Sequence, residues 1–236
     1  MGSFLKMLLY SSLAGGALVL GGYLGTKKLP DRVLSFILSL GAGILLSLIS
    51  FSLIPEAYRK AGIWGCSVSF MLGGLFFLGA DDYIERRFKT SVGMALGSFL
   101  DSVPESISIG IGFASGDGGL GLVLAVSILM HNIPEGFLSA EEMIYESELN
   151  HKWVYLIIGV VALINPLGAI FGYHFLSNLA EFWLGSIMSF AGGAILYLIA
   201  HKIIPKAYKT GSRVEIMGIL IGFLVSFLLG KIFIHN

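Results

Sequence analysis

Four ionisable side chains lie in two apolar segments at a spacing that suits metal binding. His131 and Glu135 stand four residues apart in "SILMHNIPEGFLSAEEM", and Asp101 and Glu105 repeat that spacing in "FLDSVPES". Residues i and i+4 lie one above the other on the same face of a helix. Two antiparallel helices that face each other would therefore bring three carboxylates and one imidazole around one point. That ligand set suits a divalent first-row cation.

The composition indicates the surroundings of these side chains. Of the 236 residues, 56% are hydrophobic and 13% are charged, whereas soluble domains carry roughly 25% charged residues. Mean hydropathy is +0.86. The formal net charge is zero, which gives no sign of nucleic-acid binding. A single cysteine, Cys66, excludes a disulfide framework. We therefore expect an all-α polytopic membrane protein.

Apolar runs of about 20 residues predict eight transmembrane helices. Short polar stretches separate them, so we expect one transmembrane domain over residues 1–236 without an inserted soluble domain. Ionisable side chains at the bilayer centre cost at least roughly 2.5–3.5 kcal/mol each, so they are expected to face one another, water or an ion. The predicted spans are residues 4–24, 33–55, 63–80, 91–114, 120–143, 153–176, 180–204 and 213–234.

Positively charged loop residues predict the orientation. They gather in the loops after spans 1, 3, 5 and 7, and such loops tend to be cytoplasmic. Both termini are therefore expected outside the cytoplasm, in a multi-pass protein of the inner cell membrane. The residues on the expected cytoplasmic side are Lys27, Lys28, Arg32, Arg86, Arg87, Lys89, Lys152, Lys206, Lys209 and Arg213; those on the other side are Lys6, Arg59, Lys60 and Lys231.

Two internal repeats link halves of opposite direction. "FLDSVPES" in span 4 matches "LMHNIPEG" in span 5, with a proline and a glutamate in common. "SLIPEAYRK" after span 2 matches "KIIPKAYKT" after span 7 at an offset of 150 residues. The members of each pair cross the membrane in opposite directions. Inverted repeats of this kind are typical of secondary transporters, and here they predict a 3+2+3 arrangement of the eight helices.

These residues resemble a known family. "HNIPEG" in span 5, "DSVPES" in span 4 and eight spans with both ends outside are similar to the ZIP (Zrt/Irt-like) divalent metal transporters, in particular to their GufA-like prokaryotic branch. The resemblance covers essentially the whole chain. It implies import of zinc, or of iron, manganese or cadmium, into the cytoplasm. It also implies that Asp101, Glu105, His131 and Glu135 form the metal site between spans 4 and 5.

The chain departs from the family pattern beside this site. Span 4 usually starts its motif with histidine, where this chain has Asp101. Some relatives hold a second metal with side chains at the positions of Ser102, Asn132 and Asn165. A hydroxyl and two amides are neutral ligands here, and two dications a few ångströms apart repel strongly. We therefore expect one tightly bound metal, with these three residues as its neutral neighbours.

A second departure lies at the end of span 7. The family tends to carry glutamate there, and this chain has His201 followed by Lys202. His201 is a candidate contact for the metal as it leaves. Lys202 is expected to extend its ammonium group toward the cytoplasmic headgroups.

Other functions compete with metal transport at this stage. A transport-dead or sensing relative that binds metal structurally, a proton-coupled transporter of another solute, and a plain hydrogen bond between helices all fit the buried carboxylates. An intramembrane metalloenzyme lacks support because the chain has no H-E-x-x-H motif, so we expect no enzyme. The expected partners are divalent metal ions as substrate and the lipid bilayer, with no nucleic acid; a homodimer is left open.

Overall fold

The structure is a computed structural model that describes residues 2–27, 29–87, 91–115, 118–145, 147–208 and 213–234. Within helices, the side chains at positions 85, 91–95, 101, 118, 214–216 and 233–234 are outside the description. The described residues form helices and short connections. The elements, with η marking a π-helical turn, are α1 (Ser3–Gly25), α2 (Asp31–Leu48), η1 (Ile49–Leu53), α3 (Ile54–Arg87), α4 (Ser91–Ala114), α5 (Gly118–Tyr145), α6 (His151–Ala162), α7 (Ile164–Phe171), η2 (Gly172–Leu176), α8 (Glu181–Leu198), η3 (Ile199–Ile203), α9 (Ile204–Ala207) and α10 (Arg213–Ile234).

The helices are long and apolar enough for a multi-pass membrane protein. Among the described residues, five helical stretches meet the length and hydropathy needed to cross a bilayer: Ser3–Gly25, Asp31–Ile84, Gly119–Tyr145, His151–Leu176 and Glu181–Ala207. The second is 54 residues long, and non-helical backbone at Gly62 (φ 68°, ψ 178°) divides it. The all-helical, polytopic character predicted from the sequence is confirmed. The number of eight crossings stays a prediction.

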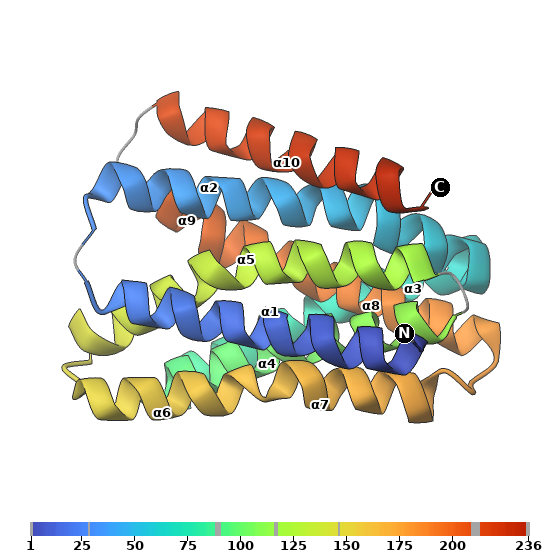
Figure 1. The fold of residues 1–236 in the computed structure, drawn as a ribbon, viewed down its shortest axis with the longest axis horizontal. Coiled ribbons are helices and arrows are strands. Elements are labelled where there is room, and N and C mark those ends of the chain that lie inside the picture. Colours follow the sequence, from blue (N-terminus) through green and yellow to red (C-terminus); the bar gives the residue numbers. More distant parts are fainter. Residues whose placement is uncertain are drawn as a thin grey trace.

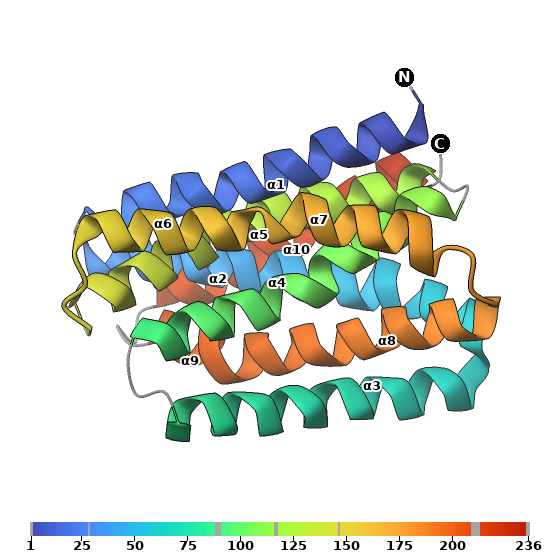
Figure 2. The same ribbon diagram turned by 90° about the horizontal axis from the view of Figure 1, so that it is seen from below.

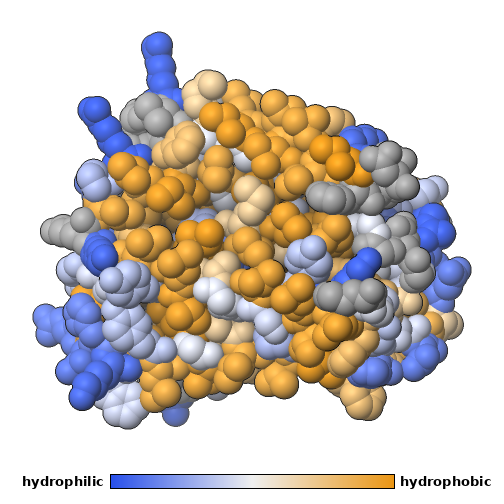
Figure 3. All heavy atoms as spheres, in the orientation of Figure 1, coloured by the Kyte–Doolittle hydropathy of each residue, from blue (hydrophilic) through white to orange (hydrophobic). Residues whose placement is uncertain are grey.

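The helices run roughly along the long axis of the bundle, with their ends gathered at two opposite sides (Figure 1). The start of α1 and the end of α10 lie at one end, while α1, α5 and α9 finish at the other (Figure 1). On the face drawn in Figure 3, hydrophobic atoms cover the middle and hydrophilic atoms gather toward the two ends. Large apolar side chains such as Trp64, Leu75 and Phe76 are exposed. This distribution matches a bilayer whose normal follows the helices.

The 150-residue repeat extends to the secondary structure. The bounds of α2 and η1 recur, shifted by 150 residues, in α8 and η3. In Figure 1, α2 and α8 run in opposite directions. The helix contacts repeat as well: α2 packs against α10 in one half, and α8 packs against α3 in the other. A π-helical turn near the "IP" motif is therefore a property of both halves.

Glycines allow these helix pairs to approach closely. A Cβ atom added at Gly43 of α2 would lie 2.1 Å from the carbonyl oxygen of Ile219 in α10. At Gly193 of α8, 150 residues later, it would lie 2.0 Å from the carbonyl oxygen of Phe70 in α3. Small residues at such contacts are the usual means of packing helices in lipid. They explain a count of 32 glycines.

Candidate metal site

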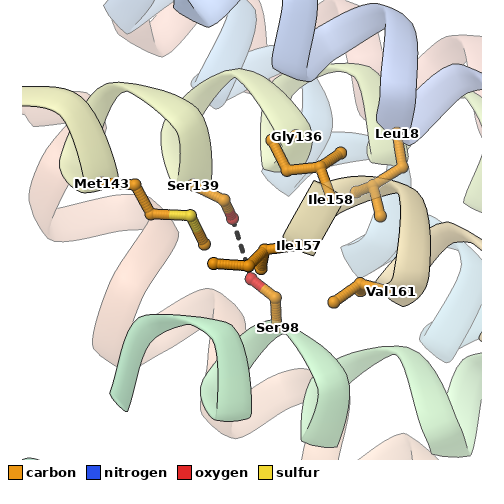
Figure 4. A pocket seen from close by; sticks show the side chains of 8 residues that line it. All are labelled: Leu18, Ser98, Gly136, Ser139, Met143, Ile157, Ile158 and Val161. Atoms are coloured by element: carbon orange, nitrogen blue, oxygen red, sulfur yellow. Dashed lines mark hydrogen bonds between the residues drawn. The ribbon is translucent and has the colours of Figure 1, made fainter. Parts of the chain in front are cut away.

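A hydrogen bond fixes the register of the two helices that carry the predicted ligands. The hydroxyl groups of Ser98 in α4 and Ser139 in α5 lie 2.8 Å apart, and Figure 4 shows them pointing toward each other. The two helices are antiparallel, so four residues forward along α4 correspond to four residues backward along α5. Position 101 is then level with the residue that follows Glu135, and Glu105 is level with the residue that follows His131. The two predicted pairs therefore share one level of the bundle.

His131 and Glu135 form the part of the site that the structure describes most fully. The His131 side chain is 1% exposed, and its Nε2 atom lies 3.5 Å from Oε2 of Glu135. Neither ring nitrogen has a hydrogen-bond partner within the described part of the chain. The Nδ1 atom faces α2, where a Cβ added at Gly41 would lie 3.4 Å away. The ring is buried with a nitrogen available to a metal.

Glu105 is also buried, at 1% exposure. Pro104 precedes it, and the hydroxyl of Ser108 donates a hydrogen bond to the Pro104 carbonyl at 2.8 Å. Asp101 lies in α4, but its side chain is outside the described part of the chain. Among the described side chains, no group of three His, Cys, Asp or Glu residues converges enough to hold a metal. The complete four-ligand set therefore stays a prediction.

The neutral residues beside the site serve as helix contacts. The Ser102 hydroxyl donates to the carbonyl oxygen of Ser98 at 2.9 Å. The Asn132 side-chain N–H donates to the carbonyl oxygen of Ala14 in α1 at 2.9 Å and to Oδ1 of Asn165 in α7 at 3.4 Å. Asn132 and Asn165 are each 1% exposed. The two amides thus connect α5 with α1 and α7, which gives them a role that needs no metal.

His201 belongs to a different cluster, at the end of the bundle where α9 lies. Its Nε2 atom is 3.5 Å from Oδ2 of Asp81 in α3, and its ring stacks on Tyr197 with centroids 5.2 Å apart. Lys202 pairs with Oδ1 of Asp81 at 3.0 Å. The sequence predicted that the Lys202 ammonium group extends toward the headgroups, whereas in the structure it pairs with a carboxylate. The contact of His201 with metal stays a prediction.

Further ion pairs lie at both ends of the bundle. Lys206 of α9 pairs with Glu142 near the end of α5. At the opposite end, Glu56 lies in the first turn of α3, between the second and third predicted spans, where Arg59 donates to it at 2.6 Å and Lys60 lies 3.3 Å away. Burial alone would raise the pKa of Glu56, but these two cations outweigh it and hold the pKa below its usual value. Charge is therefore neutralised locally where the helices emerge.

A recess next to the serine pair offers no ligand chemistry. Apart from Ser98 and Ser139 its lining is apolar, and it lies between α1, α4, α5 and α6 (Figure 4). Its apolar lining consists of Leu18, Gly136, Met143, Ile157, Ile158 and Val161.

Comparison with known proteins gives the family. The model of the family described as ZIP Zinc transporter matches residues 85–230, more than half of the chain. The chain belongs to the ZIP family. It is 30% identical to "Zinc transporter GufA" of Myxococcus xanthus, over 76% of this chain and 79% of that protein. It is 28% identical to "Zinc transporter ZupT" of Chlorobium luteolum, over 95% of this chain and 97% of that protein. It is 27% identical to "Zinc transporter ZIPB" of Bordetella bronchiseptica, over 91% and 75% respectively.

The resemblance to this ZIP family, including its GufA-like members, is therefore confirmed. These relatives are named as transporters, in line with the expectation of a protein that is not an enzyme. Sequence reasoning missed two contacts of residues that it had singled out. Gly41 of α2 borders the His131 ring, and Asp81 of α3 binds Lys202. Nothing in the sequence around Gly41 predicts its contact with His131. Asp81 is an acidic residue at the end of an apolar run, and on that ground the sequence could have marked it as a candidate partner for a cation.

Proposed function

We propose that this ZIP protein carries a divalent metal cation into the cytoplasm, with zinc as its first substrate and iron, manganese or cadmium as further candidates. The metal would bind in the middle of the membrane between α4 and α5. The ligands would be Asp101, Glu105, His131 and Glu135. The shared level of positions 101, 105, 131 and 135 along antiparallel α4 and α5, set by the Ser98–Ser139 hydrogen bond, is the observation that carries this proposal. Zinc as the substrate rests on the printed names of the relatives.

The chemistry of the site follows from its residue types. A dication that enters must exchange its water shell for protein ligands, and three carboxylates supply the negative charge that compensates this loss. His131 supplies a borderline-soft nitrogen that suits zinc. The oxygen-rich set should discriminate weakly among first-row dications beyond their intrinsic order of affinity. Protons compete for the same oxygen and nitrogen atoms, so acid should weaken binding.

The architecture that we propose has eight crossings, both termini outside and a 3+2+3 inverted repeat. The matching bounds of α2–η1 and α8–η3 support the repeat. So does the pairing of α1 with α5 and of α7 with α4. A site at the junction of two inverted halves favours transport in which one group of helices rocks against another.

Uptake into proteoliposomes tests the proposal. Purified protein would be reconstituted around a zinc-sensitive dye, and Glu105→Gln and Glu135→Gln compared with wild type. Each substitution keeps the shape of the side chain and removes its charge, so uptake should fall to background. Glu148→Gln is the matched control, because Glu148 is exposed after the end of α5, and it should transport normally.

The results separate the competing functions. Unchanged uptake in both site variants would contradict the site. A wild-type protein that binds zinc tightly and moves none would instead favour a sensing or transport-dead relative.

A further inference from the structure

A lysine ammonium group pairs with a buried carboxylate at the cytoplasmic end that we propose for the bundle. Asp81 of α3 is 6% exposed. Its carboxylate accepts a hydrogen bond from the Tyr197 hydroxyl at 3.2 Å and pairs with Lys202 Nζ at 3.0 Å. His201 Nε2 lies 3.5 Å from the same carboxylate. A carboxylate with a histidine beside it is a natural stopping place for a departing metal, and here it is paired with a cation of the chain itself.

The same ammonium group reaches the helix that carries two predicted metal ligands. A Cβ atom added at Gly97 of α4 would lie 3.4 Å from Lys202 Nζ. Position 97 is one helical turn, about 6 Å, before position 101. Figure 2 shows the first turns of α4 and α9 at the same end of the bundle. The charge of Lys202 therefore lies between α3 and α4, beside the turn of α4 that precedes position 101.

The internal repeat shows that this charge belongs to one half only. The residue 150 positions before Lys202 is Ser52, in the equivalent π-helical turn η1. The equivalent of Lys206 is Glu56. The backbone of the π-helical turn is thus shared by the two halves, while its positive charge is specific to the end near α9.

We infer that Lys202 is a tethered cation that promotes release of the transported metal. It pairs with Asp81 so that this carboxylate does not hold the metal on its way out, and its charge weakens metal binding one turn away. The inference rests on the proposed function, and Lys202 acts as a positioning residue through the field it creates at the site. Removal of a unit charge about 6 Å from a dication, at the dielectric constant of water, changes a dissociation constant roughly tenfold.

Opposite substitutions of the ion pair distinguish this role from a structural one. Equilibrium dialysis of Zn²⁺ against purified protein gives the dissociation constant, and proteoliposome uptake gives the maximal rate. Lys202→Gln should lower the dissociation constant about tenfold and slow maximal uptake, because release becomes harder. Asp81→Asn removes a negative charge that offsets the ammonium group of Lys202 and should raise the dissociation constant. If the ion pair only joined α3 to η3, either substitution would break it. Both substitutions would then shift the dissociation constant in the same direction.

Two further variants complete the design. Lys206→Gln removes the same charge one turn farther along, from a lysine paired with Glu142, and should alter the constant by no more than about threefold. Lys202→Arg retains the charge and should restore wild-type values.

The results separate failure of the inference from failure of the proposed function. Shifts of equal sign in Lys202→Gln and Asp81→Asn, or no shift in either, would overturn the inference and leave the proposed function intact. A wild-type protein that neither binds nor transports zinc would overturn the proposed function and the inference with it.

Discussion

The contact between α1 and α5 predicts that a single methyl group at Gly21 disturbs the proposed metal site. A Cβ atom at Gly21 would lie 2.0 Å from the carbonyl oxygen of Ile133 in α5. Ile133 stands between His131 and Glu135 in the sequence. Non-bonded heavy atoms prefer about 3.5 Å or more, so Gly21→Ala must push the two backbones apart by about 1 to 1.5 Å. A shift of this size exceeds the roughly 0.2 Å tolerance of metal–ligand distances.

The cost in stability can be stated against a control on the same helix. Overpacking of a filled interior costs about 1–3 kcal/mol, while alanine in place of a helical glycine returns up to about 1 kcal/mol. Gly21→Ala should therefore lower the free energy of unfolding by up to about 3 kcal/mol. Gly16→Ala, where a Cβ would meet nothing within 4 Å, should leave it unchanged or raise it by up to about 1 kcal/mol.

Two measurements check this prediction. Thermal unfolding in detergent should show a lower midpoint for Gly21→Ala than for Gly16→Ala, and zinc uptake into proteoliposomes should fall at least about tenfold in Gly21→Ala alone. Equal midpoints and equal uptake in the two variants would refute the close approach of α1 and α5 as a determinant of the site.

Other predictions concern selectivity and orientation. Asp101→His replaces a hard oxygen ligand by a nitrogen, so competition uptake should shift toward zinc over manganese; an unchanged metal preference would count against position 101 as a ligand. Cysteines placed at positions 2 and 236 should react with a membrane-impermeant reagent on intact cells, because positive charge predicts both termini outside; labelling only after lysis would reverse the orientation.

Helix positions were the most predictable part of the fold. In lipid, backbone polar groups must be satisfied within the segment, so long apolar runs have few alternatives to a helix. The predicted spans 91–114 and 213–234 match α4 and α10 in their bounds. α3 begins before residue 63, where the predicted span starts, because Gly62, with a positive φ, turns the chain while helical residues continue on both sides.

Contacts between helices were less predictable. The spacing of His131 and Glu135 places them on one face, but the approach of Gly41 to that ring depends on how α2 packs. Similarly, hydropathy placed Lys202 near the interface, whereas its pairing with Asp81 depends on the contact between α3 and η3. Neither contact can be predicted from the residues around it, because each joins segments that are far apart in the sequence.

The pair of buried amides leads to a prediction about how many metals bind. Asn132 donates hydrogen bonds to Ala14 and Asn165, so Asn132→Asp removes the donor and places a carboxylate against a carbonyl oxygen in a buried position. Without metal, this change should destabilise the protein by about 1–3 kcal/mol.

With metal, the same carboxylate becomes a ligand beside Glu105 and Glu135 and offsets part of the repulsion between two dications. Zinc should then raise the unfolding midpoint more in Asn132→Asp than in wild type, because a ligand at 100 times its dissociation constant stabilises the folded state by about 2.7 kcal/mol. Zinc content by elemental analysis should rise from one to two per chain. Two zinc ions already bound in the wild type would show that neutral amides suffice for a second site, and would refute the single-metal interpretation.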